Sequence, residues 1–496
     1  MTRAEWDVGR TKPSAIASGI SGSEGHTSGR LAGGPKAGSE DRPADRGMSA
    51  SDSILWRMER DPVLRSTVSA LSVLDRPPDW NRLRDKLALA SRRFPWLRQV
   101  VVGPPLGIGS PRWRATPDFD LDYHLRRVRL AGTGTLAEVL ELAAREAMAA
   151  IDPTRPPWEL TVVEGLGHGA AVIEKFHHAA IDGIGAMRLV AELLDPERDV
   201  DRALETLAGP GAGPAPRTGQ LVRLPLGALD AALRAARSPA RSLHDALEAL
   251  RWVGRLMAPV AEPLSPVLRA RSTRLRFAAF DIDLDRLRAA GRNSGGTLND
   301  AFVAAVVIGL RRYHEEHGQP VDRLRMTLPV SVRRPDDPPA GNRFVPVRLA
   351  VPTDPRPTRA VIEAVSTTVR DWREGPALGL TDAMADALNL LPTPVLARVF
   401  GAILRNVDFV ATNVPGPTTP VYLAGAEILG QYAFAPPSGA AVNVALVSYR
   451  TSGCIGVNMD PAAVDDSAAM TAALREGFDA VVDLDAPGTP DDPERA

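Results

Sequence analysis

The chain has 496 residues, of which 44% are hydrophobic and 24% are charged, and its formal net charge is -1. This length indicates more than one domain, and the composition is that of a globular protein that can bury a large core. The balanced charge gives no support for a nucleic-acid partner, and the single cysteine, Cys454, excludes an internal disulfide framework and a cysteine-rich zinc site.

The first 47 residues differ in composition from the rest of the chain. They are rich in Gly, Ser, Pro and charged residues, so we predict a disordered N-terminal extension over 1–47. No apolar run in this segment resembles a signal peptide core, and the longest useful apolar run, 301–310, is far shorter than the roughly 20 residues that span a bilayer. We therefore expect a cytoplasmic protein.

The next part of the chain, 48–205, alternates strand-like and helix-like patterns, so we predict a first α/β domain. Apolar residues at 136, 140, 143 and 147 form a helical stripe, and the apolar run 170–173 predicts a buried strand. Residues 208–219 are dominated by Gly, Ala and Pro, which predicts a linker, and 225–258 returns to a helical pattern. We assign 206–271 to a linker and bridging helices.

Residues 272–484 predict a second α/β domain, followed by a disordered tail over 485–496. Thr297 and Asp300 have the spacing of a capping box, so a helix is expected to begin there and to end at Gly318. A two-strand hairpin is expected to turn at Arg450 to Gly453. The apolar patterns predict strands at 324–330, 344–351, 407–413, 441–449 and 454–459.

Two adjacent histidines provide the main chemical signal in the sequence. His177 and His178 follow the predicted strand, and Asp182 and Gly183 complete the string HHAAIDG. Side chains of neighbouring residues in a strand point to opposite faces, so the pair is not expected to converge on one metal ion. No G-x-S-x-G motif supports a serine hydrolase. Two interpretations remain open from spacing alone, namely histidines at the edge of the core or one imidazole that acts as a general base.

The string HHxxxDG resembles the active-site motif of CoA-dependent acyltransferases and peptide-synthetase condensation domains. Over 49–484 the chain resembles one branch of that superfamily, the bacterial wax ester synthase/diacylglycerol acyltransferase family. Besides the histidine motif, the segments that carry this resemblance are FPWLR at 94–98, PRW at 111–113 with FDLDYH at 119–124, DPTRPPWE at 152–159, TLND at 297–300, PVSVR at 329–333 with GN at 341–342, and TNVPGP at 412–417.

The resemblance implies a fold and a set of site residues. The implied fold is two similar chloramphenicol-acetyltransferase-like α/β domains, with mixed sheets, flanking helices and a substrate tunnel between them. His178 is implied as the general base, with His177 and Asp182 as supporting residues. Gly183, Asn299 and Asp300 are implied to bind substrate, although helix capping alone also explains Asp300. No metal or cofactor is implied, because acyl-CoA is a substrate.

The resemblance also implies an activity and partners. We expect an O-acyltransferase that moves a long-chain acyl group from acyl-CoA to diacylglycerol, or to a long-chain alcohol, by direct attack without an acyl-enzyme. Such acceptors partition into lipid, so peripheral association with a membrane or lipid droplet is expected, with 221–258 as a candidate contact. Two alternatives remain: a condensation-type enzyme with a carrier-bound or other acceptor, and a non-catalytic paralogue that binds lipid or acyl-CoA.

Overall fold

The structure is a computed structural model, and it describes most of the chain between residues 45 and 484. The described residues are 45–104, 107, 109–180, 189, 192–199, 262–331, 344–373, 388–389, 391–436 and 438–484. The predicted linker at 208–219, the predicted helix at 225–258 and the tail at 485–496 lie outside them. Arg46 and Gly47, which the sequence placed in a disordered extension, form a short strand instead.

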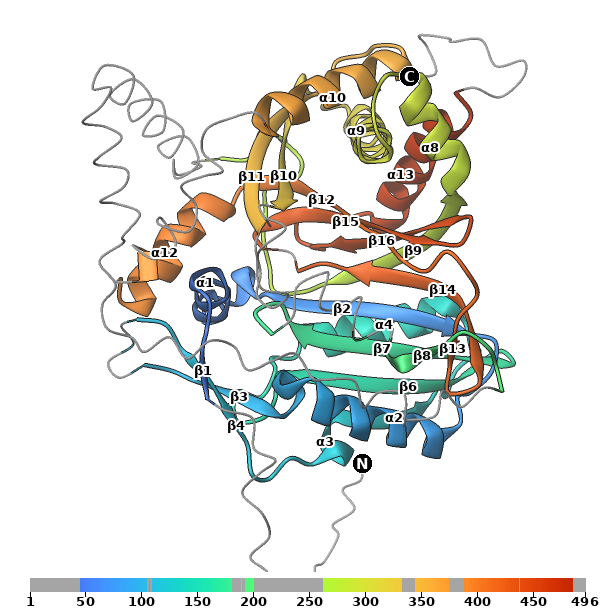
Figure 1. The fold of residues 1–496 in the computed structure, drawn as a ribbon. Coiled ribbons are helices and arrows are strands. Elements are labelled where there is room, and N and C mark those ends of the chain that lie inside the picture. The colour runs from blue at the N-terminus through green and yellow to red at the C-terminus, as the bar shows by residue number, and fades with distance from the viewer. Residues whose placement is uncertain are drawn as a thin grey trace, which may run out of the picture. The chain divides into compact units, whose positions relative to one another are not determined.

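A mixed seven-stranded sheet forms the larger of the two main sheets (Figure 1). Each of its central strands β6, β7, β2 and β14 is antiparallel to its neighbours in this series, and β5 is parallel to β6. In spatial order the strands are β5 (Leu125–Arg129), β6 (Trp158–Leu166), β7 (Gly169–His177), β2 (Thr67–Leu74), β14 (Ala426–Phe434), β13 (Tyr422–Leu423) and β8 (Leu194–Asp195).

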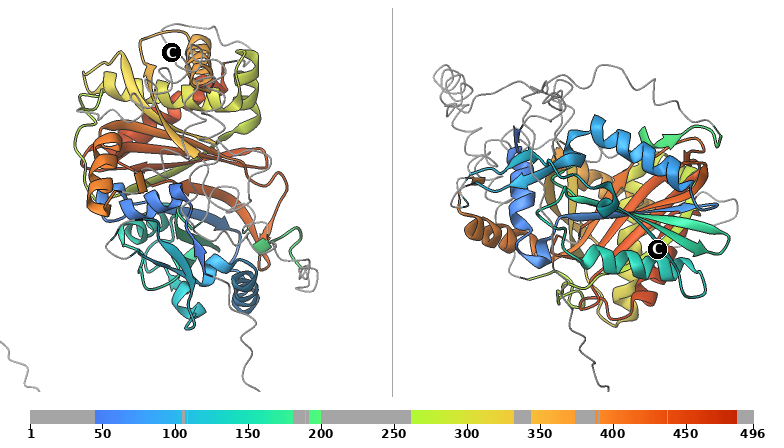
Figure 2. Two further views of the ribbon diagram at one scale, coloured as in Figure 1. Left: turned by 60° about the vertical axis from the view of Figure 1, so that its left-hand side comes forward. Right: turned by 90° about the horizontal axis from the view of Figure 1, so that it is seen from below.

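Helices lie on both faces of this sheet, as the view from below shows (Figure 2, right), with α2 on one side and α4 on the other. This part of the chain also forms a separate three-stranded sheet with the strand order β1, β4, β3. The remaining elements of this part are β1 (Arg46–Gly47), α1 (Ala50–Met58), the 3-10 helix η2 (Pro62–Leu64), α2 (Trp80–Arg93), the 3-10 helix η3 (Pro95–Arg98), β3 (Gln99–Val102), β4 (Arg112–Ala115), α3 (Leu121–His124) and α4 (Leu136–Met148).

The second main sheet has six strands and is also mixed. Strands β10, β12 and β15 are parallel to one another, and the other pairs are antiparallel. In spatial order the strands are β11 (Phe344–Pro352), β10 (Arg323–Ser331), β12 (Val407–Val414), β15 (Ala440–Tyr449), β16 (Ser452–Met459) and β9 (Arg276–Asp283). The helices of this part are α8 (Leu284–Asn293), α9 (Leu298–Glu316), α10 (Thr358–Arg373), α12 (Thr393–Leu404) and α13 (Ser467–Val482).

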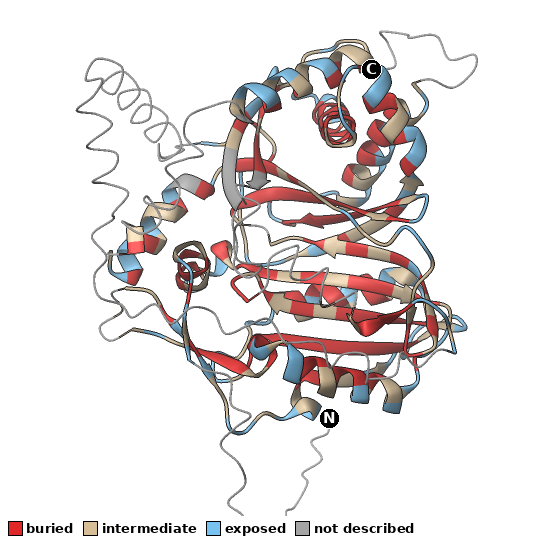
Figure 3. Ribbon diagram, in the orientation of Figure 1, coloured by how far each residue is buried: buried red, intermediate tan, exposed pale blue. Residues whose placement is uncertain are grey.

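Helix α9 lies at the centre of the second core, and Figure 3 shows it buried on nearly all sides. The sequence predicted both of its ends. Thr297 and Asp300 form the expected capping box, and Gly318 follows the last turn with a φ of +65°. A glycine tolerates this left-handed conformation, so it terminates the helix at little cost.

The five strands predicted in the second half and the helix near 136–150 are confirmed to within two residues at each end. The strand predicted at 170–173 is also confirmed, but it extends four residues further, to His177. The sequence did not predict β14, whose residues pair with β2 from Ser69 to Leu74. A strand from the C-terminal half therefore completes the sheet built by the N-terminal half. No helix among the described residues has the length and apolar character needed to cross a bilayer.

Candidate active site

The two adjacent histidines stand where β7 ends beside the start of β2. His177 is paired with Thr67 in the antiparallel ladder, and the His178 N–H donates to the Ser66 carbonyl at 2.8 Å. This bond extends the contact between the two strands one residue past the last ladder pair. Since side chains alternate along a strand, His178 is expected to face the side of the sheet opposite His177.

Each ring nitrogen of His177 contacts another group of the protein. Its Nδ1 accepts a hydrogen bond from the Ala179 N–H at 3.0 Å, and its Nε2 lies 3.2 Å from Glu59 Oε2. The Trp56 ring packs beside the imidazole, with 4.7 Å between the centroids. The side chain is only 1% exposed. Because Nδ1 is an acceptor, the neutral tautomer of the ring carries its proton on Nε2, the nitrogen that lies beside the carboxylate.

Glu59 stands at the end of α1 and joins this helix to the start of β2. Its Oε2 also accepts the Ser66 N–H at 2.8 Å. Burial by itself raises the pKa of the Glu59 carboxyl, but the hydrogen bond and charge of His177, with the Ser66 N–H, outweigh burial and lower the pKa below its ordinary value. The carboxylate is therefore ionised at neutral pH and fixes the orientation of His177.

His178 differs from His177 because its side chain is half-buried. The residues that follow, Ala179 and Ala180, are buried, so the turn after β7 packs into the protein while His178 keeps some exposure. Of the two histidines, His178 is the more exposed. Asp182 and Gly183, the other residues of the motif, lie outside the described residues.

Asn299 and Asp300 begin α9. The Asp300 carboxylate accepts hydrogen bonds from the Thr297 N–H at 2.8 Å and the Thr297 hydroxyl at 2.9 Å. Asp300 also packs against Gly296, which borders Ile362 of α10. Every described hydrogen bond of the Asp300 side chain thus stays within the capping box and does not reach His177 or His178. Asn299 is half-buried, and substrate contact by this residue pair stays a prediction.

Glu59 and Trp56 are parts of the site that the sequence did not predict. They precede the histidines by more than a hundred positions, and nothing in their local spacing marks them. In the sequence they are only a carboxylate and an aromatic residue near the end of a short helix. This pattern is common in helices of every function, so it does not identify a site.

Two other histidines, His314 and His124, make hydrogen bonds that indicate a structural role. His314 Nε2 accepts a hydrogen bond from the Ser265 hydroxyl at 2.7 Å, but both side chains are fully buried. Ser265 Oγ in turn accepts the Leu268 N–H at 2.8 Å, so the pair anchors a loop. His124 is also fully buried, donates Nδ1–H to the Trp158 carbonyl at 2.6 Å and stacks on the Trp158 ring.

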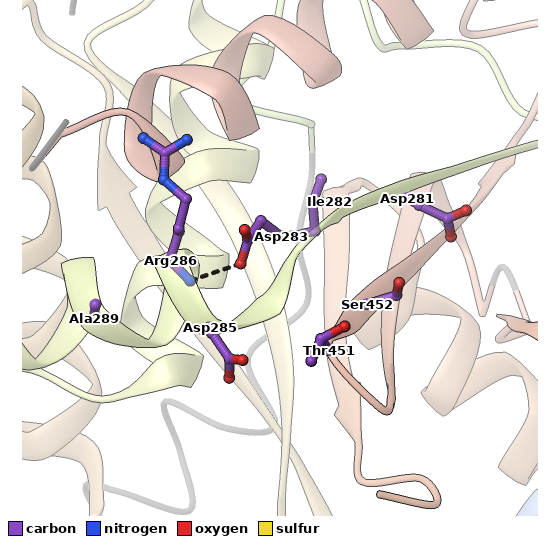
Figure 4. A pocket seen from close by; sticks show the side chains of 8 residues that line it. All are labelled: Asp281, Ile282, Asp283, Asp285, Arg286, Ala289, Thr451 and Ser452. Atoms are coloured by element: carbon purple, nitrogen blue, oxygen red, sulfur yellow. Dashed lines mark hydrogen bonds between the residues drawn. The ribbon is translucent and has the colours of Figure 1, made fainter. Parts of the chain in front are cut away.

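A surface hollow of about 720 Å³ lies at the β15–β16 turn and the start of α8 (Figure 4). It is wide open to solvent, and its acidic side chains include Asp281, Asp283 and Asp285. The hollow does not include either histidine of the motif. Among the described residues, no group of three or more His, Cys, Asp or Glu side chains is arranged to hold a metal ion.

Comparison with solved structures identifies the fold. A wax ester synthase/diacylglycerol acyltransferase from Marinobacter aquaeolei VT8 matches with a TM-score of 0.60 at 21% identity, over 89% of this chain and 99% of that one. The first condensation domain of the calcium-dependent antibiotic synthetase matches with a TM-score of 0.58 at 17% identity, over 91% and 98%. The predicted class, two sheet-rich α/β domains of the chloramphenicol-acetyltransferase-like fold, is confirmed.

Comparison of sequences identifies the family. Residues 48–302 match the wax ester synthase/diacylglycerol acyltransferase catalytic domain, and residues 340–481 match the C-terminal domain of the same family. A Mycobacterium tuberculosis protein assigned as a diacylglycerol O-acyltransferase is 37% identical over 448 residues, which cover 87% of this chain and 91% of that protein. With both family domains matched in order and this identity sustained over most of both chains, the protein belongs to the wax ester synthase/diacylglycerol acyltransferase family.

Proposed function

We propose that this protein is an acyl-CoA-dependent O-acyltransferase that transfers a long-chain acyl group to the free hydroxyl of diacylglycerol. Long-chain alcohols are proposed as second acceptors, which would yield wax esters. Family membership and the name of the Mycobacterium tuberculosis relative support the reaction class. The observation that carries the proposal is the difference between the two histidines. The His177 side chain is buried and held by Ala179 and Glu59, whereas the His178 side chain is half-buried.

The proposed chemistry is one direct transfer. The neutral imidazole of His178 accepts the proton of the acceptor hydroxyl as the oxygen attacks the thioester carbonyl. The tetrahedral intermediate collapses, the carbon–sulfur bond breaks, and the leaving thiolate of CoA takes the proton from the imidazolium. General base catalysis of this kind contributes about 10²–10⁴ in rate. No covalent acyl-enzyme is involved.

His177 is proposed as a positioning residue. Its contacts with Ala179 and Glu59 fix the start of the turn that carries His178. Asp182 is proposed to support this turn, and Gly183, Asn299 and Asp300 are proposed substrate contacts that rest on the family resemblance alone. We further propose a cytoplasmic enzyme that associates peripherally with a membrane or lipid droplet.

The proposal is tested by free CoA release from palmitoyl-CoA with the full-length protein. Dioleoylglycerol and hexadecanol are supplied in separate reactions, with His178→Ala as the key variant and Arg145→Ala, an exposed change on α4, as the matched control. We expect release with at least one acceptor and a loss of about 10²-fold or more in His178→Ala, with an unchanged circular dichroism spectrum. Equal activity of wild type and His178→Ala would refute the assignment of the base.

The remaining outcomes separate the alternatives. Turnover only when the acceptor is tethered to a carrier protein would identify a condensation-type enzyme. Binding of palmitoyl-CoA without CoA release in any reaction would identify a non-catalytic paralogue. Flotation with vesicles that contain diacylglycerol tests the peripheral association, and complete absence of the protein from the floated fraction would contradict it.

A further inference from the structure

A half-buried carboxyl that the proposed chemistry does not use lies on β7, the strand that leads to the base. Glu174 belongs to β7 and precedes His178 by four residues, so their Cα atoms are about 13 Å apart along the strand. Alternation along β7 is expected to place Glu174 and His178, one residue past the strand end, on the same face of the sheet. The opposite face carries Lys175 and His177, and the charge of Lys175 interacts with Glu146 of α4. Glu174 therefore faces away from α4.

Three polar side chains from three adjacent strands meet on this face. The Ser72 hydroxyl of β2 donates to Glu174 Oε1 at 3.0 Å, and the Gln431 amide of β14 lies 3.5 Å from Ser72 Oγ. Ser72 is directly opposite Gln431 in the ladder, and Glu174 is opposite Ala70. The strand that the C-terminal half contributes thus supplies one member of the group.

The surroundings of this polar group are apolar and only partly closed. Val68, Ala70, Phe176 and Ala433 share the face and are half-buried, whereas Leu160 and Val172 on the same face are buried. The half-buried residues form a continuous row that runs from Gln431 past Glu174 to His178. A ligand that lies along this row would contact both the base and the carboxyl.

Glu174 has no cation to balance a negative charge among the described residues. Burial raises the pKa of its carboxyl, and the hydrogen bond from Ser72 opposes this only in part. In the protonated form, which burial favours, this carboxyl can both donate and accept a hydrogen bond. Ser72 occupies one of its oxygens, and no described residue bonds to the other. Burial of such a group costs stability unless a partner compensates, and a substrate can be that partner.

We propose that Glu174, supported by Ser72 and Gln431, binds a second oxygen-bearing group of the acyl acceptor and thereby selects a glycerolipid over a simple long-chain alcohol. This inference rests on the proposed acyl transfer at His178. A diacylglycerol carries two ester groups within a few bonds of its free hydroxyl, and their carbonyl oxygens accept hydrogen bonds. A fatty alcohol carries only methylene groups there, so it gains nothing from the carboxyl.

The test compares two acceptors in matched variants of the full-length protein. Dioleoylglycerol and hexadecanol are assayed separately with palmitoyl-CoA for wild type, Glu174→Leu, Glu174→Gln and Ser72→Ala, with Glu141→Leu on the exposed side of α4 as control. Glu174→Leu is expected to lower kcat/KM for dioleoylglycerol by about 10-fold or more, the loss of one buried hydrogen bond. Its kcat/KM for hexadecanol is expected to stay within about threefold of wild type.

The two other variants separate hydrogen bonding from packing. Glu174→Gln keeps a donor and an acceptor, so it is expected to retain the preference for dioleoylglycerol, and Ser72→Ala is expected to weaken it less than Glu174→Leu. Thermal unfolding checks that each variant is folded. An equal loss with both acceptors, or no loss with dioleoylglycerol in folded Glu174→Leu, would overturn the inference.

A binding measurement separates this inference from the proposed function. Fluorescent analogues of diacylglycerol and hexadecanol are titrated into wild type and Glu174→Leu without acyl-CoA, so turnover is not needed. Selective loss of diacylglycerol binding in Glu174→Leu supports the inference even where wild type releases no CoA, an outcome that would refute only the proposed activity. Unchanged diacylglycerol binding in Glu174→Leu would refute the inference alone.

Discussion

Glu59 Oε2 lies 3.2 Å from His177 Nε2 and also accepts the Ser66 N–H, so one carboxylate ties the end of α1 to the ends of β2 and β7. The first consequence is for the neighbouring residue. Because His177 is fixed from both sides, the turn that begins at His178 starts from a rigid position. The proposed base is thus positioned by backbone geometry and by the residue before it.

Glu59→Ala is expected to destabilise the protein and to lower activity through His178. The substitution leaves the buried Nε2–H of His177 and the Ser66 N–H without their acceptor, which costs about 1–3 kcal/mol in the free energy of unfolding. Urea unfolding measures the first effect. We expect kcat to fall more than KM rises, since the proposed role of Glu59 is to position His177 and not to bind substrate. An activity profile that matches wild type would show that His177 does not position the base.

The same carboxylate predicts a loss of stability in acid. The pKa of Glu59 is lower in the folded protein than its ordinary value of about 4.3 in an unfolded chain. Its contribution to stability is therefore complete above that ordinary value and disappears as the pH falls through the lower folded pKa. The difference in unfolding free energy between wild type and Glu59→Gln, measured from pH 7 to pH 3, should shrink below about pH 4.3. A constant difference would contradict this assignment.

The capping box of α9 gives a direct test of Asp300. Thr297→Ala and Asp300→Ala each remove one side of the reciprocal cap and should each cost about 0.5–2 kcal/mol of stability. We expect the two variants to have similar KM values, because the described hydrogen bonds of Asp300 all reach Thr297. A higher KM for an acyl acceptor in Asp300→Ala alone would instead support the substrate contact predicted from the family resemblance.

The contact between the two sheets predicts an effect of Gly456. A Cβ atom at this position in β16 would lie 2.1 Å from the Ala433 carbonyl oxygen of β14, and neither backbone can yield without disturbing its own ladder. Gly456→Ala should therefore lower the unfolding free energy by about 1–3 kcal/mol, as overpacking does. Gly103→Ala is the control, since no atom lies within 4 Å of its added Cβ and its cost should stay within about 0.5 kcal/mol. Equal stability of the two variants would show that β14 and β16 separate easily.

The sequence determined by itself the features that depend on neighbours along the chain. Alternation and apolar runs located β10, β12, β15 and β16, and the spacing of Thr297 and Asp300 located the start of α9. Both follow from backbone periodicity and local hydrogen bonds. The same periodicity separated His177 from His178, because consecutive side chains in a strand cannot share a face. The order of the motifs along the chain then pointed to the family.

Only the tertiary structure decided which distant segments meet. The local pattern of β14 is that of any half-buried strand, so nothing in it specifies β2 as its partner or brings Gln431 beside Ser72. Glu59 is likewise an ordinary residue at the end of a helix until folding places it against His177. Such contacts are set by packing of whole elements, which depends on the summed burial of many side chains and leaves no mark at a fixed spacing in the sequence.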